Sequence, residues 1–232
     1  MGSTRGLFIG AYVFAGLTAI VLWLADRALL AESGLEDHFA ENATAALYLA
    51  ASLLVLGAYV SSRTQPAKFF GRDTVGNLWL PLLAIFFFVC FGEEVSWGQR
   101  VFGWGTPDAW KEVNGHHETN LHNLLDNAQL GTLRILTVIA LGYGVLVPLA
   151  DRYWPWGRRT IAWFGMPVPP LEAAGLFVMV FIAYRVLVVV YPPLDSPYGK
   201  PIREYHEAGY AAAFLVISFS LFLDYWGFNR RN

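Results

Sequence analysis

The chain has 232 residues, of which 56% are hydrophobic and 15% are charged, and its formal net charge at pH 7 is -2. This composition is too apolar for an ordinary soluble domain and predicts a polytopic membrane protein. It excludes nucleic acid as a partner, because binding to a phosphate backbone needs a concentrated basic patch and the sequence has none. The single cysteine, Cys90, lies in an apolar stretch and excludes an intrachain disulfide framework.

Six apolar stretches are long enough, or nearly so, to cross a bilayer as helices. They lie at 7–24, 43–60, 78–92, 130–150, 173–191 and 208–228. We therefore predict an all-α fold, a bundle of about six transmembrane helices with an amphipathic outer loop, forming a single integral membrane domain over residues 1–232. The third stretch is the shortest, which places Glu93 and Glu94 at or just below the membrane surface.

The distribution of lysine and arginine predicts the orientation, because these residues are enriched in cytoplasmic loops. One set of connections holds nine of them: Arg5, Arg63, Lys68, Arg72, Arg152, Arg158, Arg159, Arg230 and Arg231. The other set holds five: Arg27, Arg100, Lys111, Lys200 and Arg203. We therefore expect both termini in the cytoplasm and the connection 93–129 outside, with all five histidines on the outer side.

The stretch 85–123 is the densest in groups that transfer protons or bind metals. It begins as an apolar helix that ends on Glu93 and Glu94, and neighbouring helical residues point about 100° apart. The two carboxylates therefore have different partners. One would serve as metal ligand or general base and the other as its orienting group; the alternative is a helix terminus with counterions. With His122 and His206, they are our catalytic candidates.

A metal site is predicted within the long outer connection. Glu118, His122 and Asp126 recur every four residues on one helix face, and such spacing brings two ligands to one ion. His117 joins them if the chain folds back after the preceding turn. Histidine favours zinc or another first-row metal, so the expected cofactor is a divalent metal such as zinc. The alternative is a solvated helix face with ion pairing.

Further polar groups are candidates for substrate binding. These are Gln99, Arg100, Asn120, Asn123, Arg134 and Arg185. An arginine in the outer half of a membrane span must find an anion, so we expect Arg185 to face the interior of the bundle. Guanidinium groups donate in a planar pair that suits the phosphate of a lipid headgroup.

The segments GEEVSWGQRVFGWGTP (92–107) and ETNLHN (118–123) carry a resemblance. They are similar to bacterial integral membrane proteins that share a GEExSWGQRxFG…NLHN motif. The resemblance implies a multi-pass protein of the bacterial cytoplasmic (inner) membrane and brings no activity with it. The HExxH, P-loop and rhomboid GxSxG motifs are absent.

Three functions fit this sequence. The first is a metal-assisted enzyme whose outward-facing site acts on a lipid or a lipid-linked anionic substrate. The second is a non-catalytic subunit of a larger complex, with membrane proteins as partners. A transporter is the weakest, because a conduit needs polar residues through its full depth and the inner halves of the first three spans are almost wholly apolar.

Overall fold

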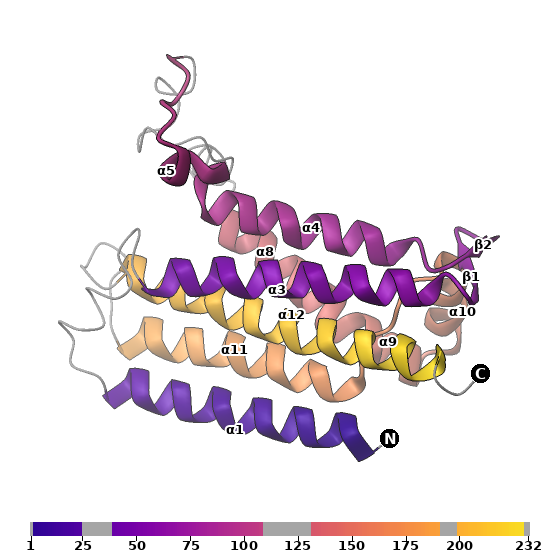
Figure 1. The fold of residues 1–232 in the computed structure, drawn as a ribbon. Helices are drawn as coiled ribbons and strands as arrows, with labels where there is room; N and C mark the ends of the chain where they lie inside the picture. The colour runs from indigo at the N-terminus through magenta and orange to yellow at the C-terminus, as the bar shows by residue number, and fades with distance from the viewer. Residues whose placement is uncertain (1, 25–38, 109–130, 191–198, 230–232) are drawn as a thin grey trace.

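The computed structural model of the chain describes residues 2–24, 39–108, 131–190 and 199–229. It is mostly helical, at 82%, which confirms the all-α expectation. The longest uninterrupted helices are α1 (Gly2–Leu24), α3 (Phe39–Ser62), α4 (Trp79–Glu94), α11 (Leu171–Val190) and α12 (Gly199–Asn229). They lie side by side along their lengths, as Figure 1 shows.

Four helical segments are long and apolar enough to cross a membrane. They are Phe39–Ser62, Thr132–Tyr153, Leu171–Val190 and Pro201–Gly227. The 16-residue α4 is shorter than this requirement, and the apolar segment within α1 runs only over Gly6–Thr18. The structure therefore supports an integral membrane protein, while the count of six spans stays a prediction.

α12 is the central helix of the bundle. It packs most extensively against α3 and also contacts α11, while α4 packs on α3. The ring of Phe214 on α12 lies 5.3 Å from that of Phe87 on α4 and 5.0 Å from that of Phe177 on α11. Between α3 and α4, the Ser52 hydroxyl donates to the Ala84 carbonyl at 2.8 Å. This bond satisfies a buried hydroxyl that would otherwise be costly to desolvate.

The candidate membrane-spanning segment 132–153 has three parts: α8 (Thr132–Leu141), the π turn η2 (Gly142–Leu146) and α9 (Val147–Tyr153). Pro148 near the start of α9 has no N–H to donate to the carbonyl four residues earlier, so the α-helical hydrogen-bond pattern is interrupted at the π turn.

The π turn also brings two helices close together. A Cβ atom at Gly144 would overlap the ring of Phe177, which is fully buried. Small residues permit such close approach between membrane helices, where van der Waals packing drives association. The glycine therefore lets Phe177 of α11 lie against the backbone of the interrupted crossing.

Two elements between the long helices were not predicted from the sequence. A hairpin of β1 (Pro66–Phe69) and β2 (Arg72–Val75) follows α3, with Phe69 opposite Arg72. The short helix α10 (Pro155–Phe164) follows α9. Neither contains a long apolar run, so the sequence indicates only connections between apolar stretches at these positions.

The hairpin caps the C-terminal end of α10. The last carbonyls of a helix have no partner within it. Here the N–H of Gly71 donates to the Trp163 carbonyl at 2.7 Å and that of Phe70 to the Phe164 carbonyl at 3.3 Å. The indole of Trp79 also donates to the Phe164 carbonyl, at 2.7 Å. The hairpin, α10 and the start of α4 therefore form one hydrogen-bonded unit.

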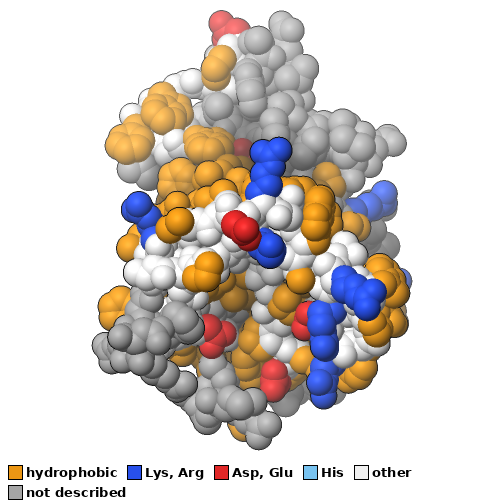
Figure 2. All heavy atoms as spheres, turned by 90° about the vertical axis from the view of Figure 1, so that its right-hand side faces the viewer, with side chains coloured by type: hydrophobic (Ala, Val, Ile, Leu, Met, Phe, Trp, Pro, Cys, Tyr) orange, Lys and Arg blue, Asp and Glu red, His pale blue; other side chains and the backbone are white. Residues whose placement is uncertain are grey.

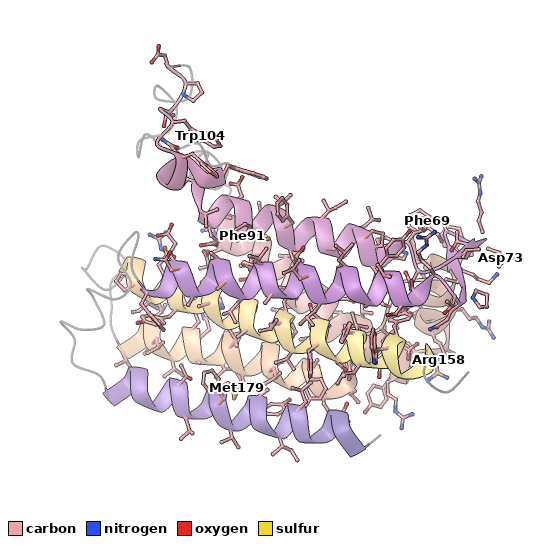
Figure 3. The ribbon with its side chains drawn as sticks, viewed as in Figure 1. Phe69, Asp73, Phe91, Trp104, Arg158 and Met179 are labelled. Carbon is pink, nitrogen blue, oxygen red and sulfur yellow. The ribbon has the colours of Figure 1, made fainter. Side chains whose placement is uncertain are left out.

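The hairpin, α10 and both described chain ends lie at the same end of the bundle (Figure 1), which we call the basic end. Its elements carry six residues of the set that predicts the cytoplasmic side: Arg63, Lys68, Arg72, Arg152, Arg158 and Arg159. Figure 2 shows lysine and arginine side chains spread over this face among hydrophobic and a few acidic ones. Figure 3 places Phe69, Asp73 and Arg158 there, and Phe91 and Trp104 at the opposite end.

Candidate functional site

The carboxylates predicted as catalytic lie at the end of the bundle opposite the basic end, where α4 ends and α3 and α12 begin (Figure 1). We call this the acidic end. α4 is followed by η1 (Ser96–Gly98) and α5 (Gln99–Phe102), which project beyond the bundle. The Gln99 side chain donates to the Thr106 hydroxyl at 2.8 Å, a bond that fixes the start of this projection.

A strained turn follows the two glutamates. Ser96 and Trp97 have φ of 44° and 53°, a left-handed conformation that is costly for residues other than glycine. The turn folds the Trp97 indole back over Gly92, where a Cβ atom would lie 2.9 Å from the ring. Its N–H donates to Glu93 Oε1 at 2.7 Å. These four residues of the GEExSW motif thus build one local structure that holds Glu93.

The partners of Glu94 differ from those of Glu93, because neighbouring residues of a helix point about 100° apart. The Glu94 carboxyl group interacts electrostatically, in decreasing order, with Glu207, Glu204, Glu41 and Glu93. Glu204 and Glu207 lie near the start of α12, and Glu41 lies in the first turn of α3. Neighbouring carboxylates disfavour one another's charge, so the cluster is suited to hold a proton.

Tyr48 of α3 forms the buried wall of this cluster. The residue is 1% exposed, and its hydroxyl has no hydrogen-bond partner among the residues that the structure describes. The phenol lies within electrostatic range of Cys90, Glu94 and Glu207. The hydroxyl is therefore near carboxyl groups of α4 and α12, without a hydrogen bond to either. Sequence analysis missed Tyr48, and the only signal was a lone phenol in the outer half of an apolar span.

His206 lies on another side of α12. It is 4% exposed, and its ring stacks on Tyr184 of α11 at 4.0 Å between centroids and contacts Tyr210 at 4.4 Å. Neither ring nitrogen has a hydrogen-bond partner within the described parts of the chain. Because Glu207 faces α3 and α4, the adjacent His206 faces away from the carboxylates. The structure therefore places His206 and Glu94 at the same end of the bundle without bringing their side chains into contact.

The two arginines expected in the site are both exposed, Arg134 on α8 and Arg185 on α11. The expectation that Arg185 faces the interior of the bundle is wrong. It shares its face of α11 with Ile182 and Val189, which are 54% and 76% exposed. A long cationic side chain near the end of a membrane helix can extend along the helix to the polar interface, so it does not need an anion inside the bundle.

The other predicted site residues lie outside the described residues. They are His117, Glu118, Asn120, His122 and Asn123, together with the side chain of Arg100. Among the described residues, no group of three or more His, Cys, Asp or Glu side chains is arranged to hold a metal ion. The metal site built on Glu118, His122 and His117 therefore stays a prediction.

No protein-family model, curated protein or solved structure matches this chain. Functional inference therefore rests on the geometry of the acidic end. The acidic end combines carboxyl groups from three helices with a buried phenol, which is a set able to exchange protons.

Proposed function

We propose that the protein is a membrane-embedded enzyme whose site at the acidic end acts on a lipid or lipid-linked substrate. The observation that carries this proposal is the grouping of Glu94 with Glu41, Glu204 and Glu207 beside the buried hydroxyl of Tyr48. Carboxyl groups that share a confined space differ in their affinity for protons, so one can act as a general base while another acts as an acid.

A divalent metal ion would offset the repulsion between these carboxylates and an anionic substrate. The described part of the acidic end would repel a phosphate, because its carboxyl groups outnumber nearby cations and both arginines point outward. Glu94 together with His122 and Glu118 would hold such an ion, which would supply a Lewis acid for an anionic phosphoryl group. Zinc suits such a histidine and carboxylate set.

The bundle interior favours an enzyme over a transporter. Among the described residues, the buried charged or imidazole side chains are Glu41 and His206, and both lie at the acidic end. Deeper in the bundle, the buried polar groups include the hydroxyls of Ser52, Ser218 and Ser220. A proton or ion relay needs ionisable groups through the full depth of the membrane.

An accessory subunit is the second candidate function. On the projection after α4, Phe102 is 75% exposed and Trp104 is 48% exposed. Their rings lie 5.7 Å apart, so they form one aromatic surface beyond the bundle. Aromatic residues are enriched in protein interfaces, and this surface suits another membrane protein.

The proposed setting is the bacterial inner membrane, with six crossings and both termini in the cytoplasm. It is supported by the shared location of the chain ends and the basic residues, because arginine and lysine accumulate on the cytoplasmic side. The acidic end then opens to the outer side. The resemblance of the GEExSW segment to bacterial membrane proteins agrees with this setting.

Paired glutamine substitutions test the enzyme proposal. Glu94→Gln should abolish complementation of a deletion strain and lower the metal content of the purified protein, because it removes a base and a ligand. Membrane insertion should be unchanged. Arg72→Gln, at the basic end, should retain both properties. A wild-type protein purified without stoichiometric metal, or a Glu94→Gln variant that complements fully, would refute the proposed mechanism.

A further inference from the structure

A second site lies at the basic end. A cavity of about 360 Å³ opens between the hairpin, the end of α10 and the end of α12, within the size range of small-molecule sites. Its lining includes Gln65, Lys68, Asp73, Asn77, Gly165 and Tyr225. None of these residues belongs to the acidic end, so the cavity is independent of the proposed enzyme site.

Gln65 supplies an unsatisfied donor. Its Nε2 nitrogen is buried and has no hydrogen-bond partner among the described residues. A buried donor without an acceptor is destabilising, so the position favours a ligand that brings an acceptor oxygen. The backbone of Gln65 is fixed at both sides, since its N–H donates to the Ser62 carbonyl and its carbonyl accepts from the Gly76 N–H.

Lys68 supplies positive charge to the wall. Its Nζ lies 3.0 Å from Asp73 Oδ1, and this bond uses one of three ammonium donors. The Asp73 side chain is 88% exposed, so water screens its charge more than that of Lys68, which is 52% exposed. Arg63 is also exposed, on the turn that leads into the hairpin. The cavity mouth is therefore surrounded by more cationic than anionic groups.

Tyr225 supplies a hydroxyl in a fixed position. Its oxygen accepts a hydrogen bond from Asn77 Nδ2 at 3.1 Å, and the same amide donates to the Gly165 carbonyl at 3.1 Å. A hydroxyl that accepts from an amide keeps its own proton for donation. The Tyr225 hydroxyl is therefore held in position to donate its proton to a third group.

We propose that this cavity binds a phosphate-bearing anion, with Gln65 Nε2, Lys68 Nζ and the Tyr225 hydroxyl as donors. Phosphate offers three or more acceptor oxygens, which matches donors arriving from different sides. The cavity adjoins an aromatic cluster typical of the membrane interface, formed by Phe69, Phe70, Trp79, Trp163 and Phe164. Basic pockets between membrane helices on the cytoplasmic side bind phospholipid headgroups.

Calorimetric titration of the purified full-length protein in detergent tests this proposal, with dihexanoyl phosphatidic acid as the probe. Binding should be saturable at one site. Lys68→Gln and Gln65→Leu should each weaken it about tenfold or more, the usual effect of losing a hydrogen bond to a charged group. Arg72→Gln is the matched control, because it removes the same charge from the same hairpin without lining the cavity.

Competition with inorganic phosphate identifies the source of the anion. Displacement of the lipid at similar concentrations would indicate a free phosphate compound, and failure to displace it would indicate a lipid headgroup; both outcomes support the site. Absence of saturable binding, or an Arg72→Gln effect as large as that of Lys68→Gln, would overturn it in favour of general surface attraction. Tyr225→Phe keeps the ring in place and should weaken binding without unfolding the protein, which circular dichroism would check.

Discussion

The side-chain amide of Asn77 and the hydroxyl of Tyr225 are joined by a hydrogen bond of 3.1 Å, although 148 positions separate them in the sequence. The same amide reaches the Gly165 carbonyl, and its oxygen accepts from the Trp79 N–H at 3.0 Å. One buried side chain therefore holds together the start of α4, the end of α10 and the end of α12. These are the elements that surround the cavity at the basic end.

Asn77→Ala should lower the free energy of unfolding by about 2 to 4 kcal/mol. It removes three buried hydrogen bonds, each worth about 1 kcal/mol, and leaves their partners unsatisfied. Tyr225→Phe removes only one of these bonds and should cost about 1 kcal/mol. Unfolding in a denaturing detergent would measure both variants. Equal losses would contradict a connecting role for Asn77.

Gly144→Ala should destabilise the bundle by about 1 to 3 kcal/mol, the typical cost of overpacking. The added methyl group overlaps the Phe177 ring, so the ring must move. Gly142→Ala is the control within the same π turn, because a Cβ atom there meets nothing within 4 Å. The melting temperature should fall for the first variant and hold for the second. A Phe177→Leu substitution should restore part of the loss at Gly144.

Glu94→Gln and Glu93→Gln should shift thermal stability in opposite directions when measured with a metal chelator. The first removes a carboxyl group whose charged form is disfavoured by burial and by the neighbouring carboxyl groups, so it should raise the melting temperature at alkaline pH, where that group ionises. The second weakens the acceptor of the Trp97 indole and should lower it by the equivalent of about 1 kcal/mol. A lower melting temperature for Glu94→Gln under these conditions would show that the carboxyl groups do not repel.

Cysteine labelling tests the proposed orientation. In a Cys90→Ala background, we would introduce Phe102→Cys on the projection and Asp73→Cys on the hairpin, both strongly exposed positions. A membrane-impermeant maleimide should label the first in cells whose outer membrane is permeabilised, and the second only after the inner membrane is opened. Labelling of both from the same side would contradict a bundle that spans the membrane.

The sequence predicted where the long helices lie, but it predicted their first residues less accurately. Continuous apolar stretches located each long helix, because transfer into lipid requires such a stretch. The helices themselves extend further: α3 begins at Phe39 rather than 43, and α12 begins at Gly199 rather than 208. Hydrophobicity marks the part inside the membrane, whereas backbone hydrogen bonding continues into polar turns such as the one that contains Glu204.

Long-range pairing was not predictable from the sequence. The hairpin depends on its docking to α10, and nothing local in residues 66–75 indicates that partner. In the candidate site, the sequence did predict that Glu93 and Glu94 face different groups, because the two are neighbours on one helix. The contribution of Tyr48 depends on how α3 rotates against α4, which only tertiary packing fixes.

The capping of α10 by the hairpin also makes exchange with deuterium informative. The amides of Phe70 and Gly71 have their acceptors in α10, so solvent deuterium reaches them only when the helix separates from the hairpin. These amides and those in the last turn of α10 should therefore show one common free energy of opening. The elements between residues 66 and 164 at the basic end would then open and close as a single cooperative unit.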